Sequence, residues 1–255
     1  MARIFITGST DGLGRAAAQS LLEQGHQVVV HARSPERASA MSDLGLRAEG
    51  VVIGDLRSAS ETRSIAGQVN ALGPMDAVIH NAGVYSLPDR GSTAEGHAAV
   101  LAVNTLAPYI LTALIERPQR LVYLSSGLHR GGAGSLRDID WRKRPWDSPK
   151  AYAESKLQVV ALAFALARRW PNVRSNAVDP GWVRTRMGGP GAPGDLDTGQ
   201  RTQTWLAASD DPAALVSGRY WHHLRQKEPA RECMDQAFQE ELISVLEDLT
   251  GVALP

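Results

Sequence analysis

The chain has 255 residues, and its 27 lysines and arginines balance 27 aspartates and glutamates, so the formal net charge is zero. Neutrality argues against a nucleic-acid-binding protein, which is normally basic. The single cysteine, Cys233, excludes an internal disulfide framework and a cysteine-rich zinc site. Because no apolar run reaches about 18 residues and the start lacks a signal-peptide pattern, we expect a cytoplasmic protein that does not bind a membrane.

Short apolar runs alternate with helix-like segments along the chain. The expected strands are Arg3–Thr7, Gln27–His31, Ala48–Ile53, Ala77–His80, Arg120–Ser125 and Val173–Val178. The expected helices are Gly14–Gln24, Pro35–Leu44, Ser58–Leu72, Thr93–Glu116 and Ala151–Trp170. Nearly continuous apolar strands are typical of a parallel sheet that is covered on both faces. Strand–helix alternation without a linker or repeat predicts one doubly wound α/β domain, residues 1–255.

Two long stretches interrupt this alternation. Gly127–Lys150 and Met187–Thr198 are rich in glycine and proline and are predicted to be irregular. Long irregular segments in compact domains are usually functional or disordered, and open α/β sheets bind ligands beyond the carboxyl ends of their strands. We therefore expect the segment 187–215 to cap a substrate pocket; exposed insertions without a role are the alternative.

A glycine-rich turn follows the first strand and leads into a helix. It reads Thr7-Gly8-Ser9-Thr10-Asp11-Gly12-Leu13-Gly14. Gly8 allows a tight turn, Gly12 removes a side chain where the backbone approaches a pyrophosphate, and Gly14 lets the helix pack close to the sheet. The helix start offers free N–H groups and positive potential to phosphates. The predicted dinucleotide-binding residues in this turn are Gly8, Ser9, Thr10, Gly12 and Leu13.

The end of the second strand points to the form of the cofactor. An acidic residue there would bind the 2′-hydroxyl of NAD, but this chain reads His31-Ala32-Arg33-Ser34. Arg33 can pair with a 2′-phosphate through a charge-assisted hydrogen bond, assisted by Ser34 and Arg37. The sequence therefore favours NADP(H) over NAD(H). The alternative is that Arg33 only lies at a solvated helix start.

The glycine turn resembles the cofactor motif of the short-chain dehydrogenase/reductase family, and six further motifs share this resemblance in the family's order. They are Asp55-Leu56, Asn81-Ala82-Gly83, Val103-Asn104-Thr105, Leu124-Ser125-Ser126, Tyr152-Ala153-Glu154-Ser155-Lys156 and Pro180-Gly181-x-Val183-x-Thr185. The resemblance implies a single doubly wound (Rossmann) fold with a mostly parallel central sheet. It also implies that further residues contact the cofactor, namely Asp55, Leu56, Asn81, Ala82, Gly83, Tyr152, Lys156, Pro180, Gly181, Val183 and Thr185.

The same resemblance implies a catalytic set of Asn104, Ser126, Tyr152 and Lys156. Their spacing places Tyr152 and Lys156 on one face of a helix. A nearby ammonium group is expected to lower the pKa of the phenol, which is ordinarily near 10, toward the pH at which the enzyme works. By analogy with the family, Tyr152 protonates the developing alkoxide and Ser126 orients that oxygen. Asn104 holds a water linked to Lys156.

One departure from the shorter family members lies between the two catalytic motifs. Ser126 and Tyr152 are 26 residues apart, about twice the separation in those members. The additional stretch, and the run Ser125-Ser126-Gly127-Leu128-His129, resemble the retinol-dehydrogenase-like and carbonyl-reductase-like branch. The choice of Ser126 over Ser125 rests on this analogy. The insertion falls on a surface that many family members use for oligomerisation. The sequence is therefore compatible with both a monomer and a homo-oligomer.

The sequence thus predicts an oxidoreductase that transfers hydride between NADP(H) and a small-molecule carbonyl or alcohol substrate. The alternative is a non-catalytic NAD(P)-binding regulatory protein on the same fold, which would not need all four catalytic residues. A nucleotide-sugar epimerase or dehydratase of the extended family would carry a larger C-terminal domain than the roughly 70 residues that follow Gly181.

Several other residues carry weaker expectations. Adjacent strand residues face opposite sides, so His222 and His223 are not expected to ligate one metal ion. His129 is a candidate pocket residue, whereas Cys233 is expected to be inert. The sequence leaves two interpretations of the aromatic residues Trp182, Trp205, Tyr220 and Trp221. They form an apolar substrate pocket, or they belong to the hydrophobic core.

Overall fold

The computed structural model describes residues 1–255, except for the side chain of Ser42. Its centre is one eight-stranded sheet of order β3-β2-β1-β4-β5-β6-β7-β8. The strands are β1 (Arg3–Ile6), β2 (Gln27–Ala32), β3 (Gly50–Ile53), β4 (Ala77–His80), β5 (Arg120–Leu124), β6 (Arg174–Asp179), β7 (Tyr220–His222) and β8 (Arg225–Lys227). All neighbouring pairs are parallel except β7 and β8. The predicted doubly wound, mostly parallel sheet is confirmed.

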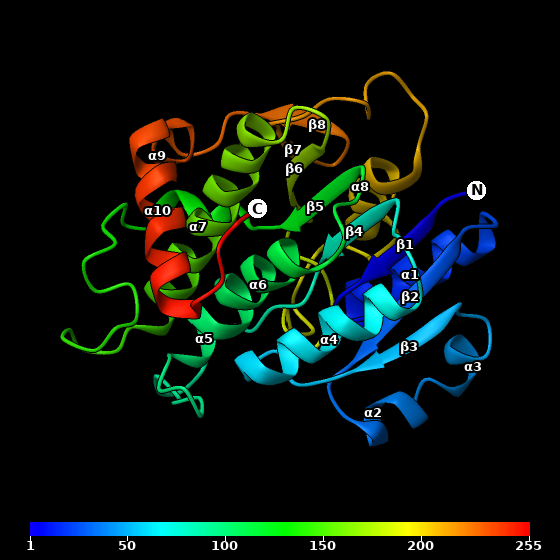
Figure 1. Ribbon diagram of the computed structural model, residues 1–255, viewed down its shortest axis with the longest axis horizontal. Coiled ribbons are helices and arrows are strands. Elements are labelled where there is room, and N and C mark those ends of the chain that lie inside the picture. The colour runs from blue at the N-terminus through cyan, green and yellow to red at the C-terminus, as the bar shows by residue number, and fades with distance from the viewer.

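Helices cover both faces of this sheet (Figure 1). They are α1 (Gly12–Glu23), α2 (Pro35–Ser39), α3 (Ser42–Gly45), α4 (Ala59–Ala71), α5 (Ala99–Leu101), α6 (Ala107–Leu114), α7 (Ser148–Arg169), α8 (Leu196–Ala208), α9 (Arg231–Met234) and α10 (Gln236–Thr250). A π-helix, η1 (Ala102–Leu106), joins α5 to α6, and a 3₁₀-helix, η2 (Gly127–Gly131), follows β5. Helices α1 and α8 pack together, as do α4 and α6, and α10 packs on α7. Among the described residues, no helix is long and apolar enough to cross a membrane.

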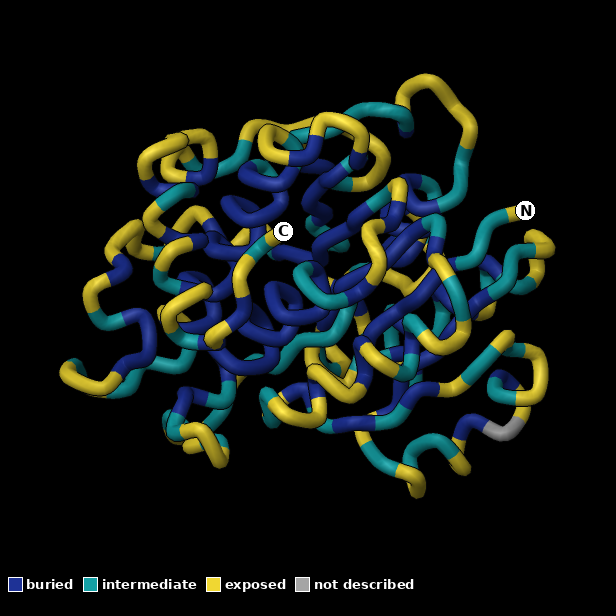
Figure 2. Tube along the Cα trace, in the orientation of Figure 1, coloured by how far each residue is buried: buried dark blue, intermediate teal, exposed yellow. Residues whose placement is uncertain are grey.

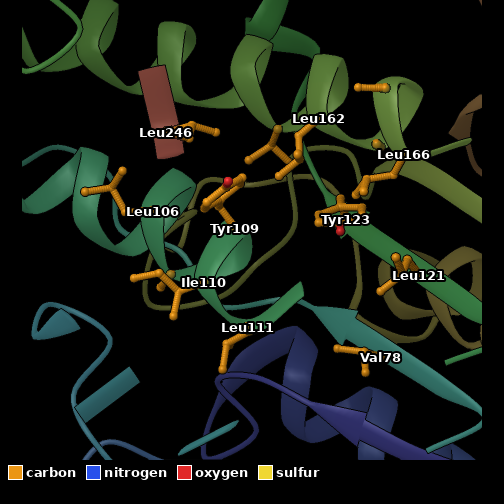
Figure 3. Packing of buried hydrophobic residues seen from close by; sticks show 14 of the residues in the cluster. Val78, Leu106, Tyr109, Ile110, Leu111, Leu121, Tyr123, Leu162, Leu166 and Leu246 are labelled. Atoms are coloured by element: carbon orange, nitrogen blue, oxygen red, sulfur yellow. The ribbon is translucent and has the colours of Figure 1, made fainter. Parts of the chain in front are cut away.

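The alternation of side chains along the strands produces two core layers. In β1, Ile4 and Ile6 belong to the layer under α1 and α8, whereas Phe5 belongs to the layer under α4, α6 and α7. Figure 3 shows part of the second layer, where Tyr109 of α6 lies near Leu162 of α7. Each such side chain contributes about 1.5–3 kcal/mol by leaving water. Burial is concentrated in the sheet and α7, and exposed residues lie mainly in the connections (Figure 2).

Two predicted helices differ from the structure. The predicted helix Pro35–Leu44 is interrupted and forms the two short helices α2 and α3. The predicted helix Thr93–Glu116 begins only at Ala99, because residues 93–97 form a turn instead. In this turn the Thr93 amide donates to the His97 carbonyl at 2.9 Å, and Gly96 has a φ of 83°. A left-handed glycine at this point prevents the helix from starting earlier.

The predicted irregular stretch Gly127–Lys150 is tied to the rest of the fold by buried charge. The carboxylate of Asp140 accepts hydrogen bonds from the Ala98 amide (2.6 Å) and the Arg142 guanidinium (2.8 Å), and it pairs with Arg90 at 2.9 Å. Burial alone would raise the pKa of Asp140, but hydrogen bonds from His97, Ala98 and Arg142 outweigh it and lower the pKa to about 2. The insertion is therefore held against the segment that leads into α5.

Candidate active site

A cavity of about 340 Å³ opens at the carboxyl ends of the central strands, where the strand order reverses between β1 and β4. It extends from the glycine turn after β1 to Tyr152 and Lys156 of α7. The predicted site residues that line it are Gly8, Thr10, Gly12, Leu13, Arg33, Asp55, Leu56, Asn81, Ala82, Gly83, Tyr152, Lys156, Pro180 and Thr185. The remaining predicted residues lie outside the lining, and they are Ser9, Ser34, Asn104, Ser126, Gly181 and Val183.

The glycine turn is held in shape by its neighbours across the sheet. Gly8 has a φ of 68°, and a β-carbon on Gly14 would lie 2.3 Å from the Gly8 oxygen, so neither position accepts a larger residue without strain. The Asn81 side-chain amide donates to the Thr7 and Gly8 carbonyls at 3.0 and 3.3 Å. Asn81, at the end of β4, therefore fixes the path of the chain where β1 gives way to α1.

Ser9 and Ser34 have local structural contacts rather than a place in the lining. The Ser9 hydroxyl donates to the Ile6 carbonyl at 2.5 Å and accepts from the His31 amide at 3.2 Å. Ser34 is the N-cap of α2, and its hydroxyl accepts from the Arg37 amide. Both side chains thus shape the turns that carry the cavity wall.

Positive charge gathers at the end of the cavity near β2 and β3. Arg33 is exposed there, and Arg37 donates to the Thr10 hydroxyl at 3.3 Å. Asp55 is paired with Arg57, whose Nη2 lies 2.7 Å from its Oδ2. Burial alone would raise the pKa of Asp55, but the bonds from Arg57 outweigh it and lower the pKa. Because Arg57 neutralises Asp55, the arginines dominate this end of the cavity.

Tyr152 stands at the opposite end of the cavity, with its ring edge-on to Tyr85 at a centroid distance of 4.6 Å. Burial raises the pKa of Tyr152 to about 12, while a hydrogen bond with the Ser126 side chain lowers it in part. The sequence predicted a lowered pKa for this phenol, and in this respect the prediction was wrong. Desolvation of the phenolate outweighs the nearby polar groups, so Tyr152 is protonated at neutral pH.

The two adjacent serines at the end of β5 have different surroundings. The Ser125 hydroxyl is buried and donates to the Lys156 carbonyl at 3.0 Å. Ser126 is partly exposed, and its hydroxyl accepts from the Leu128 amide at 3.2 Å in addition to bonding Tyr152. Ser125 lines the cavity and Ser126 does not, but the side chain that lowers the pKa of the Tyr152 phenol is that of Ser126.

Lys156 lies one helical turn beyond Tyr152 and is held by the end of β5. Its Nζ donates to the Leu124 carbonyl at 2.7 Å and lies 5.7 Å from the centre of the Tyr152 ring. Burial lowers the pKa of Lys156 to about 8. A β-carbon on Gly83 would lie 3.4 Å from both Lys156 Nζ and Asn104 Oδ1. The absence of a side chain at Gly83 therefore lets these two polar groups converge.

Asn104 lies in the π-helix η1 rather than in a regular α-helix, and such bulges are frequent at functional sites. Its Oδ1 accepts from the Val84 amide at 2.8 Å, and its Nδ2 donates to the Val84 carbonyl and to Ser155 Oγ, each at 3.0 Å. The Ser155 hydroxyl in turn donates to the Tyr152 carbonyl. Asn104 therefore links the connection after β4 to the helix that carries Tyr152.

The loop after β6 closes the cavity from the other side. The Asp179 carboxylate accepts from the Gly181 amide at 2.9 Å, and Val183 pairs with Gly194 within the loop. A β-carbon on Gly12 would lie 3.3 Å from the Thr185 side chain, so the loop reaches the glycine turn. Arg186 reinforces this contact by pairing with Asp11 at 3.0 Å.

The premise that His222 and His223 face opposite sides of a strand was wrong. Their rings stack at a centroid distance of 3.9 Å, because His223 lies just beyond β7 with a φ of 46° and turns back. His129 is fully buried outside the cavity lining; its Nε2 accepts from the Ala230 amide and its Nδ1 donates to the Ser126 carbonyl. Burial raises the pKa of Cys233 to about 12, so it is a poor nucleophile.

The four aromatic residues divide between core and surface. Trp205 and Trp221 meet edge-on in the layer under α8, and Tyr220 is buried in the opposite layer. Trp182 alone of the four is largely exposed, at 62%. Its indole N–H donates to the Gly188 carbonyl at 2.9 Å, which places Trp182 on the loop beside the cavity.

Sequence reasoning missed several residues that line or border the cavity. His31, Arg57 and Arg186 line it, and Tyr85 contacts Tyr152. The signal for His31 was present, since it is a histidine within the apolar strand QVVVHA. The contact of Tyr85 had no local signal, because it depends on the packing of the connection after β4 against α7.

Residues 8–209 match the family model described as enoyl-(acyl carrier protein) reductase. An oxidoreductase of Emericella nidulans described as uncharacterised is 44% identical over all of this chain and 99% of its own length. The short-chain dehydrogenase chyC of Penicillium rubens is 42% identical over the full length of both chains. Human retinol dehydrogenase 13 is 28% identical over 99% of this chain and 85% of its own.

Solved structures share the fold. A protein from Mycobacterium paratuberculosis superposes with a TM-score of 0.85 and 26% identity, covering 100% of this chain and 95% of its own. A short-chain dehydrogenase from Burkholderia cenocepacia, crystallised with NADP, has a TM-score of 0.69 and 20% identity over 87% of this chain and 95% of its own. Motifs, relatives and fold agree, and the chain belongs to the short-chain dehydrogenase/reductase family of oxidoreductases.

Proposed function

We propose that the protein transfers hydride between NADP(H) and a small-molecule carbonyl or alcohol, with Tyr152 as the general acid–base. The observation that carries the proposal is the cavity itself. One cavity has the glycine turn and arginines at one end and Tyr152 with Lys156 at the other. An extended dinucleotide would place its phosphates and its reactive ring at these two ends.

The residues present fit a phosphorylated nicotinamide cofactor. Gly12 and Gly14 leave the start of α1 open to a pyrophosphate, since side chains at these positions would meet Thr185 and Gly8. Arg33 and Arg37 supply cationic donors of the kind that bind a 2′-phosphate. The acids that line the cavity, Asp11 and Asp55, are already paired with Arg37 and Arg57. This charge pattern supports NADP(H) over NAD(H).

The protonation states favour carbonyl reduction at neutral pH. When bound, the reduced nicotinamide supplies the hydride. Tyr152, with a pKa of about 12, holds the proton that the developing alkoxide needs. Ser126, whose side chain lowers the pKa of that phenol, would donate to the same oxygen and stabilise its charge. Lys156 and Asn104 approach each other at Gly83, and we propose that this polar pair provides the route by which the phenol is reprotonated.

The rim of the cavity supports an apolar substrate. Three large apolar side chains are exposed on the segments that border it, Leu128 (51%), Trp182 (62%) and Met187 (45%). Within the proposed cap, 187–215, the part that reaches the cavity is Met187. Helix α8 packs against α1 and the central strands instead. We propose that residues 182–195 contact the substrate and that α8 anchors them.

A direct spectrophotometric assay distinguishes this function from that of a non-catalytic regulatory protein on the same fold. The protein is mixed with NADPH or NADH and a panel of apolar ketones and aldehydes, and the loss of reduced-cofactor absorbance is followed. We expect turnover with at least one carbonyl and a preference for NADPH. Tight cofactor binding without turnover across the panel would support the regulator, and binding of neither cofactor would contradict the site itself.

A further inference from the structure

A buried histidine connects the glycine turn to the two strands beside it. His31, the fifth residue of β2, is only 3% exposed. Its backbone pairs with Ser9 in both directions: the Ser9 amide donates to the His31 carbonyl, and the His31 amide donates to the Ser9 hydroxyl, each at 3.2 Å. The imidazole adds two further bonds, one to Gly8 and one to Gly54.

The two ring bonds determine the protonation state of the imidazole. The Gly8 amide donates to Nδ1 at 2.9 Å, so Nδ1 carries no proton. Nε2 lies 2.8 Å from the Gly54 carbonyl oxygen, which is only an acceptor, so Nε2 must carry the proton. His31 is therefore a neutral imidazole with both nitrogens satisfied, and it joins the start of the turn at Gly8 to the end of β3.

We propose that His31 is a positioning residue that holds the glycine turn in its cofactor-binding shape only while its imidazole is neutral. The inference rests on the proposed cofactor site. A protonated ring would present an Nδ1 proton to the Gly8 N–H, which places two donors face to face. Gly8 would then lose its acceptor, and the turn that approaches the pyrophosphate would lose a fixed point.

The surroundings of His31 favour the neutral form. Burial lowers the pKa of His31, while the Gly54 carbonyl and the charge of Asp55 partly oppose this shift. The charged groups that share the cavity come from each adjoining segment: Asp11 before α1, Arg33 and Arg37 after β2, and Asp55 and Arg57 after β3. Asp11 and Asp55 already pair with Arg37 and Arg57. Arg186 and Lys156 also line the cavity, and Arg186 shares Asp11 with Arg37. The cavity therefore holds more cationic than anionic side chains, which disfavours a protonated imidazole.

Two substitutions separate the acceptor at Nδ1 from the donor at Nε2. In His31→Asn the amide oxygen stands where Nδ1 does, one bond beyond Cγ, so an acceptor for Gly8 is retained. In His31→Gln the amide nitrogen reaches the place of Nε2, and the acceptor for Gly8 is lost. The matched control is His26→Asn, because the Ala2 amide likewise donates to His26 Nδ1 at 3.1 Å, but at the amino end of the strands.

NADPH binding is measured by the quenching of tryptophan fluorescence, with thermal unfolding followed in parallel. At pH 8 we expect His31→Gln to bind about tenfold more weakly than the wild type. His31→Asn and His26→Asn should bind within about threefold of the wild type. As the pH falls through the lowered pKa of His31, the wild type should lose affinity faster than His31→Asn, because only the wild type has an imidazole to protonate at this position. The 2′-phosphate titrates alike in both proteins.

The wild type also provides a test that needs no substitution. Nitrogen-15 chemical shifts of the imidazole in the cofactor-free protein should show the Nε2–H tautomer for His31 at pH 8. The Gly8 amide should be less protected from exchange, relative to its intrinsic exchange rate at the same pH, when the ring is protonated. Equal NADPH affinity in wild type and His31→Gln, parallel pH curves for wild type and His31→Asn, or an Nδ1–H tautomer would overturn the inference. Failure of the wild type to bind either cofactor at any pH would instead contradict the proposed function.

Discussion

The ammonium nitrogen of Lys156 lies 5.7 Å from the centre of the Tyr152 ring while it donates a hydrogen bond to the Leu124 carbonyl at the end of β5. The helix spacing alone would allow Lys156 many positions, but this bond ties it to the sheet. The packing of α7 on β5, and not the helix spacing by itself, therefore sets the distance between Tyr152, the proposed acid, and the ammonium group of Lys156.

The variants Ser126→Ala and Ser125→Ala are predicted to have different defects, the first in catalysis and the second in stability. Ser126→Ala should lower kcat for carbonyl reduction about 10²- to 10³-fold with little change in thermal stability, because it removes a donor to the developing alkoxide. Ser125→Ala removes a buried hydrogen bond to the Lys156 carbonyl and should chiefly lower the free energy of unfolding, by about 1 kcal/mol. Steady-state kinetics and urea unfolding of both variants check this; equal kinetic defects would refute the assignment.

Asp179 is predicted to set the pH dependence of the reaction. Its carboxylate raises the pKa of Tyr152, after the larger effect of burial. Asp179→Asn should therefore lower that pKa, so that alcohol oxidation, which needs the phenolate, becomes effective at a lower pH. The pH profile of kcat/KM measures the change. Asp210→Asn, at a fully exposed aspartate outside the cavity lining, is the control and should leave the profile in place.

Arg33 is predicted to discriminate between the two cofactors. Arg33→Ala should weaken NADPH binding about 10- to 100-fold and leave NADH binding nearly unchanged, because a charge-assisted bond to the 2′-phosphate is lost. Titration with each cofactor gives the two dissociation constants. Arg47→Ala, an exposed arginine outside the cavity lining, serves as the control. A similar loss for both cofactors would mean that Arg33 does not recognise the phosphate.

Asp140 is predicted to be a stabilising residue of the insertion. Asp140→Ala should lower the free energy of unfolding by about 3 kcal/mol, because it leaves the buried Ala98 amide and the partly buried Arg90 guanidinium without their acceptor. The pKa of Asp140, about 2 in the folded protein, lies below its ordinary value of about 3.9. Its contribution is thus present above that ordinary value and is lost as the pH falls toward 2. Urea unfolding of wild type and variant at pH 7 and pH 3 measures both effects; an unchanged stability at pH 7 would contradict the prediction.

The sequence was most informative where a motif and a strand end coincide. Gly8 and Asn81 were predicted from motifs next to short apolar strands, and Tyr152 from the Tyr-x-x-x-Lys motif of a helix. The structure brings all three to one cavity. Parallel strands place their carboxyl ends at one edge, so the order of motifs was enough to gather them. The retinol-dehydrogenase-like resemblance was likewise visible in the long separation of Ser126 and Tyr152.

The sequence was least informative about properties that depend on tertiary contacts. The raised pKa of Tyr152 depends on burial, which no spacing reveals. The turn at Gly96 and the stacked rings of His222 and His223 depend on left-handed residues whose conformation the sequence does not report. Helix α10 was not predicted, although Phe238, Leu242 and Leu246 repeat at helical spacing and pack in the layer that contains α7.

The central claim is that Tyr152 supplies the proton for hydride transfer from NADPH to a carbonyl carbon, and isotope transfer tests it most directly. The protein is incubated with NADPH that carries deuterium at the transferable position and with a carbonyl substrate, and the alcohol is analysed by mass spectrometry. The wild type should place deuterium on the former carbonyl carbon. Tyr152→Phe should do so at least about 10²-fold more slowly while still binding NADPH. Transfer at the wild-type rate by Tyr152→Phe, or no transfer by a wild type that binds NADPH, would contradict the account.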